Sequence, residues 1–272
     1  MSIVNLSAGE EAIERPRRVE TSTQGYAQLI RISKYLSICG VTSRRGADAL
    51  IAAGRVTIND TTVEKPGTLV DETNDVIKVD GTEVSPVEKK IYVLLNKPKM
   101  VMTTLHDPFS RRTVRHYLRR LRHRVYPVGR LDYDTQGVLL LTNDGDLAYR
   151  LTHPKYQIPR IYEARVTGQF KREEVLRIQA GIKLDDGATG RANVSILGFV
   201  KNSTRIRLLL TEGRKREVKQ LCKKVGHPVE QLVRVEFAGV TAKNLRLGEW
   251  RFLADREVER LKEAVGLPID GE

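Results

Sequence analysis

The sequence predicts an α+β fold with a small N-terminal domain and a larger second domain built on a mainly antiparallel mixed sheet. At 272 residues the chain exceeds what one hydrophobic core usually holds, so two domains are expected. Strand-like segments outnumber helical ones and hairpin-like connections predominate. This pattern favours antiparallel pairing over a doubly wound parallel sheet.

The small domain is expected at residues 29–85, after a flexible tail at residues 1–28 that has little periodic apolar content. From Leu29 apolar residues recur at roughly helical spacing up to Gly40. Ser43 can then cap a second helix that ends at Gly54. Short strands with turns follow at 55–60 and 76–81, and a linker closes the domain.

The second domain, residues 90–272, alternates short strands with helices. Each helix begins near a polar residue, and most end near glycine or proline. We expect strands at 91–95, 126–131, 138–142, 161–166, 194–197 and 205–210, and helices at 146–151, 172–180, 216–225 and 256–265.

Composition excludes several classes of protein. With 40% hydrophobic and 30% charged residues the chain reads as globular, and its apolar runs are too short for a bilayer crossing. No signal-peptide core is present, so we expect a cytoplasmic location. Cys39 and Cys222 give no disulfide framework, the five histidines lack metal-ligand spacing, and no phosphate-cradling glycine motif occurs. We therefore expect neither a metal nor a cofactor.

The charge pattern points to a polyanionic partner. The chain has 47 Lys and Arg against 34 Asp and Glu, a net charge of +13, and the surplus lies after residue 90. The segment from Arg111 to Arg130 contains eight arginines and no carboxylate, with histidines and tyrosines between them. That mixture suits phosphate contact and base stacking. A second basic cluster spans residues 214–224, and a solvated basic face stays open as the alternative.

The segment from Pro127 to Gly145 places Asp132 and Asp134 beside Arg130 and between two apolar runs. Glycines at both ends allow a sharp turn, so we expect a loop that holds a carboxylate in a cleft rather than a continuous strand. From composition alone, a turn aspartate that bonds its own backbone is the alternative to a functional acid.

This segment closely resembles the signature GRLDxDTxGLLLLTNDG of the RsuA/RluB-type pseudouridine synthases, with Val138 at a leucine position. Residues 95–98, 160–168 and 212–219 resemble further blocks of that family in the same order, and residues 30–84 resemble an S-four type RNA-binding domain. The chain departs from the family pattern at two positions. Met100 stands where a glycine commonly follows the Lys-Pro pair, and Arg160 stands where the block with Tyr162 usually begins with lysine.

The resemblance implies an isomerase that converts a uridine of ribosomal RNA to pseudouridine without a cofactor. By its matching positions Asp132 is the nucleophile, Lys219 the cation paired with it, and Tyr162 the ring against the target base. Arg130 would reach the RNA. We expect a large-subunit, 23S rRNA or pre-ribosomal substrate and a monomeric enzyme.

RNA-binding residues are expected in both domains. In the small domain the cations of one helix-pair face would contact phosphates, which position the RNA without reading its sequence. In the second domain the basic cluster before Lys219 would add contacts. The expected RNA-binding residues are Lys34, Arg44, Arg45, Arg55, Arg130, Arg214 and Arg216.

Two other functions stay open. A ribosome-assembly factor could keep the RNA-binding surface without turnover, although intact Asp132, Tyr162 and Lys219 argue against it. A nucleosidase or glycosidase could use Asp132 and Asp134 as an acid and base pair, and it would release free base.

Overall fold

The computed structural model describes residues 29–87 and 89–269, so the expected tail at 1–28 lies outside the described residues. The chain divides into two compact units, one with residues up to Ser37 and Thr42–Val84, the other with Ile38–Val41 and the residues from Ser85 on. Each unit is described by itself below. In the described part of the chain, no helix has the length and apolar character needed to cross a membrane.

The first unit packs two short helices against short antiparallel strands. Ser43 caps the second helix by accepting a hydrogen bond from the Gly46 N–H at 3.0 Å. The buried core includes Leu36, Ile51 and Ile77, and the sheet order is β3-β2-β5-β6. The elements are β1 (Leu29–Arg31), α1 (Ile32–Ile38), α2 (Arg44–Ala52), β2 (Val56–Ile58), β3 (Thr61–Thr62), β4 (Leu69–Asp71), β5 (Ile77–Val79) and β6 (Thr82–Glu83).

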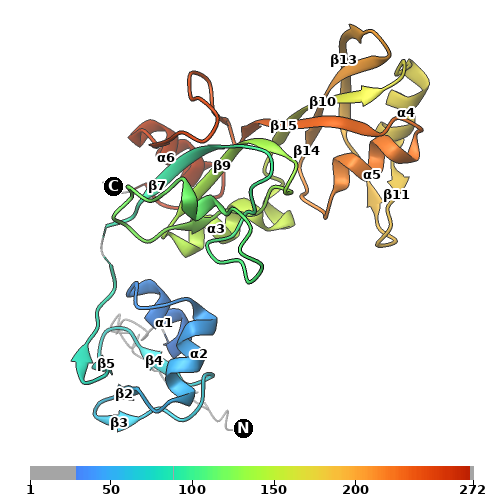
Figure 1. Cartoon of the computed structure of the whole chain (residues 1–272). Helices are drawn as coiled ribbons and strands as arrows, with labels where there is room; N and C mark the ends of the chain where they lie inside the picture. The colour runs from blue at the N-terminus through green and yellow to red at the C-terminus, as the bar shows by residue number, and fades with distance from the viewer. Residues whose placement is uncertain (1–28, 88, 270–272) are drawn as a thin grey trace, which may run out of the picture. The chain divides into compact units, whose positions relative to one another are not determined.

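The second unit is built on a long mixed sheet of order β13-β14-β10-β15-β9-β7-β17 (Figure 1). All its neighbouring strands are antiparallel except β15 and β9, which run parallel. The predicted mainly antiparallel mixed sheet is confirmed. Its main strands are β7 (Tyr92–Lys97), β9 (Gln136–Thr142), β10 (Arg160–Thr167), β13 (Asn193–Val200), β14 (Ser203–Leu210), β15 (Val229–Phe237) and β17 (Trp250–Phe252). Short strands are β8 (Tyr126–Pro127), β11 (Ile182–Lys183), β12 (Thr189–Gly190) and β16 (Val240–Thr241).

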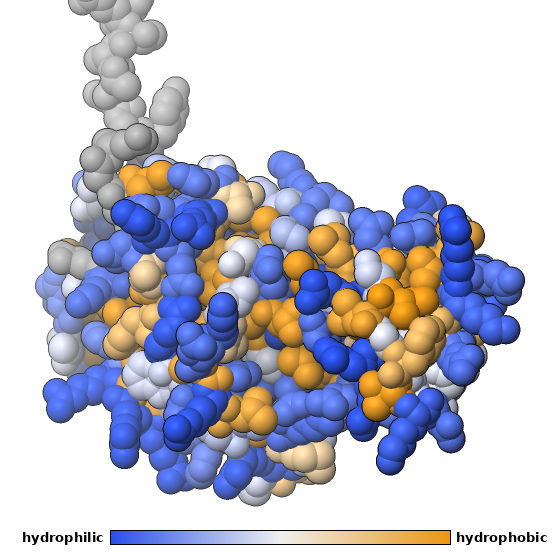
Figure 2. Space-filling view, turned by 90° about the horizontal axis from the view of Figure 1, so that it is seen from above, coloured by the Kyte–Doolittle hydropathy of each residue, from blue (hydrophilic) through white to orange (hydrophobic). Residues whose placement is uncertain are grey.

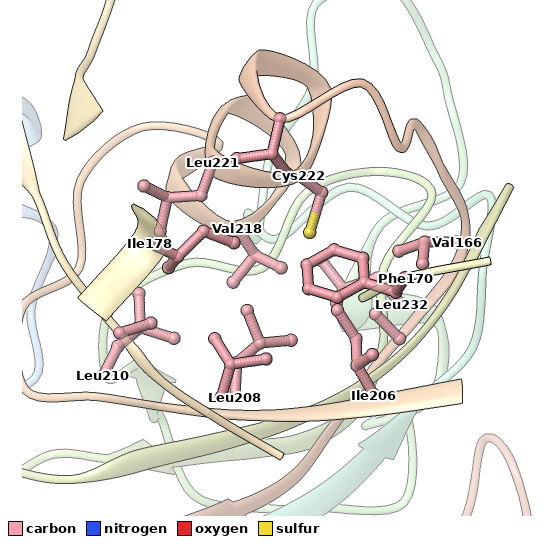
Figure 3. Close-up of a cluster of buried hydrophobic side chains, with 14 of the residues drawn as sticks. Val166, Phe170, Ile178, Ile206, Leu208, Leu210, Val218, Leu221, Cys222 and Leu232 are labelled. Carbon is pink, nitrogen blue, oxygen red and sulfur yellow. The ribbon is translucent and has the colours of Figure 1, made fainter. Parts of the chain in front are cut away.

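Helices and an irregular segment cover this sheet. Figure 3 shows α5 side chains, among them Val218 and Leu221, packed toward Leu208 and Leu210 of β14. This packing fixes α5 on the sheet. The helices are α3 (Gly145–Thr152), α4 (Arg172–Ala180), α5 (Glu217–Lys224) and α6 (Asp255–Glu263), with 3₁₀ turns η1 (Val114–His116) and η2 (Pro154–Tyr156).

Strand β9 is buried on both sides, which explains its unbroken apolar run. Leu140 packs with the α3 and α6 side, whereas Leu139 and Leu141 pack with Val114 and Leu118 of the segment between β7 and β8. A strand covered on both faces needs no polar alternation. The segment of residues 98–125 is therefore anchored by its own apolar residues over one face of the sheet.

Gly137 lies where β9 meets β15, and no other residue type fits there. A Cβ at this position would lie 2.1 Å from the Arg234 carbonyl oxygen, and the backbone φ is +107°. Both facts require glycine. The close approach joins the two halves of the sheet directly behind the loop of residues 128–135.

The predicted elements agree with the structure in many places, but Leu29–Arg31 form strand β1 rather than the start of a helix, and strands β4 and β17 were not predicted. The predicted strand at 126–131 ends at Pro127, because Gly129 adopts φ +71° and turns the chain into a loop. Strand β15 was missed. The loop predicted for Asp132 is present, so the continuous-strand alternative is wrong.

The face shown in Figure 2 carries many hydrophilic side chains, with apolar residues between them. Apolar residues also reach the surface, notably on the edge strand β13, where Ile196, Leu197, Phe199 and Val200 are exposed.

Candidate active site

Asp132 lies in the loop that precedes β9, and several hydrogen bonds fix the loop backbone. The Thr135 N–H donates to the Asp132 carbonyl at 3.1 Å, which closes a turn. The Thr103 hydroxyl donates to the Leu131 carbonyl at 2.7 Å, and the Met100 N–H donates to the Tyr133 carbonyl at 2.7 Å. Met100 itself adopts φ +60°, which explains why glycine is common at that position.

The buried side chain of Lys97 also holds this loop in place through hydrogen bonds to backbone carbonyls. Lys97, at the end of β7, is 0% exposed, and its Nζ donates to the carbonyls of Thr135 at 2.8 Å, Asp132 at 3.0 Å and Pro98 at 3.1 Å. Burial lowers the pKa of Lys97 to about 8, although Asp134 and Asp132 oppose this. In the sequence Lys97 follows an apolar run, and this local pattern does not predict its role under the loop.

Lys219 of α5 connects the two carboxylates of the loop. Its Nζ lies 3.0 Å from Asp132 Oδ2, and it also forms an ion pair with Asp134 Oδ1. The side chain of Lys219 is 14% exposed, against 35% for Asp132 and 57% for Asp134. Burial tends to raise the pKa of Asp134, but the hydrogen bond and charge of Lys219 outweigh it, so the net shift is downward.

A small hollow opens beside Asp132. Tyr162 of β10 lines it together with Arg130, and the residues at the start of α5 form its other wall. Asp132 also lines a second, wider cleft. Asp134 lines the wider cleft but not the hollow. Asp132 is thus the carboxylate shared by both spaces.

Two polar residues of the hollow, Thr135 and Glu217, were not predicted, whereas Arg214 was expected as an RNA contact. The Thr135 Oγ1 and the Arg214 Nε are buried and have no hydrogen-bond partner among the described residues. The Glu217 side chain is buried and accepts a hydrogen bond from the Arg214 N–H at 3.0 Å. Burial raises the pKa of Glu217. Their roles depend on tertiary burial, for which the sequence gives no signal.

The predicted RNA-binding residues of the second unit lie around one hollow, whereas the remaining predicted RNA-binding residues belong to the first unit. Arg214 and Arg216 line the hollow with Arg130, and Arg214 also pairs with Glu212 at 2.8 Å. Arg160, in place of the usual lysine, is buried and donates to three backbone carbonyls.

In the first unit, Arg44 and Arg45 are exposed at the start of α2, and Lys34 is half-buried on α1. Arg55 forms an ion pair with Asp80 rather than standing open to a ligand. Its hydrogen bond to Asp80 raises the pKa of Arg55.

The arrangement suits covalent chemistry on a small planar group. An open carboxylate held by an ammonium can act as a nucleophile, and an aromatic ring beside it can stack on a ligand. No cluster of three or more potential metal-ligating side chains occurs in the described ranges.

Comparison with known proteins assigns the fold and site to a family. A model of the RNA pseudouridylate synthase family matches residues 91–224, and a model of the S4 domain matches residues 30–77. A *Bacillus subtilis* (strain 168) chain named ribosomal large subunit pseudouridine synthase B is 39% identical over 85% of this chain and 95% of its own length. The chain belongs to the RNA pseudouridylate synthase family. It is a pseudouridine synthase, an isomerase, as the sequence predicted.

A second relative and a solved structure support the same family membership for this pseudouridine synthase. An *Aquifex aeolicus* (strain VF5) RNA pseudouridine synthase is 40% identical over 88% of this chain and 96% of its own. A solved pseudouridylate synthase structure covers 85% of this chain and 99% of its own, with 27% identity and a TM-score of 0.62.

Proposed function

We propose that this pseudouridine synthase converts a specific uridine of 23S ribosomal RNA to pseudouridine, in free RNA or a pre-ribosomal particle, as a cytoplasmic monomer. Relatives named ribosomal large subunit pseudouridine synthase B, from *B. subtilis* and *Vibrio cholerae*, support the large subunit as the source of the substrate. The net charge of +13 suits a polyanionic RNA.

One observation carries the catalytic assignment: Asp132, paired with Lys219 at 3.0 Å, is the carboxylate that shares a hollow with Tyr162. In the proposed reaction Asp132 attacks as the ionised nucleophile, and the glycosidic bond from uracil nitrogen to ribose carbon 1 breaks. The uracil turns over in the hollow, its ring carbon 5 bonds to ribose carbon 1, and the covalent bond to Asp132 breaks, which restores the free carboxylate. The carbon 5 proton is lost and a ring nitrogen gains one, so no cofactor is consumed.

Tyr162 and Arg130 would handle the extruded base. The Tyr162 ring stacks on the uracil, and its hydroxyl approaches the proton that leaves carbon 5. Arg130 is exposed at the rim of both spaces, where it contacts RNA phosphate or fills the gap left by the base. Flipping a paired uridine costs a few kcal/mol, so a loop or weakly paired target is favoured.

Phosphate contacts would position the RNA. We assign RNA binding to the domain at residues 29–85, through Lys34, Arg44, Arg45 and Arg55, and catalysis to residues 90–272. Arg55 would have to exchange its partner Asp80 for phosphate. Arg214 and Arg216 add contacts beside the hollow.

Mapping pseudouridine in rRNA from cells with and without this chain tests the proposal. We expect one 23S rRNA position to lose its pseudouridine and to regain it when the wild-type chain is supplied. An unchanged map would contradict the proposal and favour the non-catalytic assembly factor. Release of stoichiometric free uracil by the purified protein would favour a nucleosidase instead.

A further inference from the structure

A shallow hollow, separate from the one beside Asp132, is lined by cations and hydroxyl groups. Its wall holds Arg111, Arg112, Arg115, Arg119 and His116, with one serine and one threonine. No carboxylate contributes to the wall. A concave surface with donors on every side fits an anion, and guanidinium groups match the oxygens of a phosphate.

Part of this charge is not neutralised within the protein. Arg111 forms an ion pair with Asp107 at 2.7 Å, and Arg112 lies over the Tyr117 ring. Neither Arg115 nor Arg119 has an ion-pair partner among the described residues. Burial, together with Arg119 and Arg112, lowers the pKa of His116, so a neutral imidazole with an N–H to donate lies among these arginines.

The backbone that carries the arginines is fixed before any ligand binds. Val114 and Leu118 are buried in the core beneath the hollow. The Val114 N–H donates to the Met102 carbonyl at 3.0 Å, and the Met102 N–H donates to the Arg112 carbonyl at 2.8 Å. Binding therefore orders side chains only, which keeps the entropic cost low.

The hollow and the catalytic cleft share one lining residue, Arg111. The same cleft contains Arg130 and Asp132. Phe109, 75% exposed, stands beside Arg111 with its ring centre 5.0 Å from the guanidinium carbon. A strand with one nucleotide at Asp132 would leave the cleft past this aromatic and arginine pair.

We propose that the hollow at Arg115 and Arg119 binds a backbone phosphate of the RNA strand that continues from the target uridine. This inference rests on the proposed function and adds a second anchor to it. A strand held at Asp132 and at the hollow has its direction over the enzyme fixed, which a contact at the uridine alone does not achieve. The contact is to phosphate, so it positions the RNA without reading its sequence.

The test compares a double variant, Arg115→Gln with Arg119→Gln, with a control that removes the same charge from exposed arginines of α4, Arg172→Gln with Arg177→Gln. The probe is deproteinised 23S rRNA, and binding is measured from 50 to 300 mM salt. Loss of the phosphate contact should reduce the slope of log affinity against log salt by about 0.7–0.9. We expect about 10-fold weaker binding at 100 mM salt, with the control within about 2-fold of wild type.

Two further measurements separate this site from folding and from catalysis. The charge-retaining variant Arg115→Lys with Arg119→Lys should recover most of the affinity and the full salt slope. At saturating RNA the glutamine variant should form pseudouridine at the wild-type rate, because neither residue lines the Asp132 hollow.

Equal weakening of the glutamine variant and the α4 control would overturn the proposal, as would wild-type affinity in both. Competition by inorganic phosphate as strong as by RNA would mean that the hollow binds free anions rather than the strand. If no RNA is modified even by the wild type, the proposed function fails while the binding comparison still decides whether the hollow holds RNA.

Discussion

Replacing Lys97 with methionine would remove the buried charge under the Asp132 loop while keeping a similar side-chain volume. Three carbonyls accept hydrogen bonds from Lys97 Nζ at 2.8–3.1 Å, in a site with no solvent exposure. Such bonds from a charged donor are worth about 1.5–3 kcal/mol each. The cost of burying the ammonium offsets part of that sum, so we expect Lys97→Met to lower the free energy of unfolding by about 3 kcal/mol.

Thermal unfolding followed by calorimetry measures this loss. For a chain of this size about 3 kcal/mol corresponds to a Tm roughly 6–12 °C lower. Lys99→Met is the matched control, because Lys99 lies two residues away and is only half-buried. A Tm of Lys97→Met within about 1 °C of the control would refute the reasoning, since the three carbonyls would then need no ammonium.

The pH dependence gives an independent check with a defined sign. The pKa of Lys97 is about 8 in the folded state, below its ordinary value near 10.4. Between these two values the unfolded chain binds a proton that the folded chain does not, so the unfolding free energy of wild type should rise with pH. Relative to Lys97→Met the rise should approach about 1.4 kcal/mol per pH unit, measured by urea unfolding from pH 7 to 10. A flat difference would contradict the lowered pKa of Lys97.

The same geometry supports three further predictions. Gly137→Ala places a Cβ 2.1 Å from the Arg234 carbonyl oxygen and should cost about 3 kcal/mol or more, measured by urea unfolding, and wild-type stability would contradict the close approach. Burial raises the pKa of Cys222 to about 12, so iodoacetamide should label the half-buried Cys39 in the native protein and Cys222 only after unfolding, as mass spectrometry can verify. Thr135→Val removes a buried hydroxyl that has no hydrogen-bond partner among the described residues, so the free energy of unfolding should stay within about 0.5 kcal/mol of wild type, measured by urea unfolding. A loss of more than about 2 kcal/mol would contradict an unpaired hydroxyl.

Local patterns in the sequence predicted the elements that they alone determine. Ser43 caps α2 as expected, and the predicted helix at 172–180 has the bounds of α4, because capping residues and apolar period act over short distances. Strand β15 was missed although Val229–Phe237 carries strand-forming residues, since its charged positions, such as the buried Arg234, mask the alternation.

The residues of the site could be predicted only in part. The motif identified Asp132, Tyr162 and Lys219, and the structure places Asp132 within an ion-pair distance of Lys219 and in one hollow with Tyr162. The sequence motif gave no sign that Asp134 pairs with the same Lys219 ammonium or that Lys97 supports the loop. Those relations join segments of the chain tens of residues apart, so they depend on tertiary packing and not on local pattern.

The most direct test of the account compares Asp132→Asn with Asp134→Asn. The two wild-type carboxylates lie in the same loop and both contact Lys219. Each purified variant is incubated with rRNA from cells that lack the chain, and pseudouridine and RNA affinity are both measured. The account predicts that Asp132→Asn binds RNA as well as wild type but forms no pseudouridine, whereas Asp134→Asn keeps measurable turnover. Pseudouridine formation by Asp132→Asn at the wild-type rate would contradict the account.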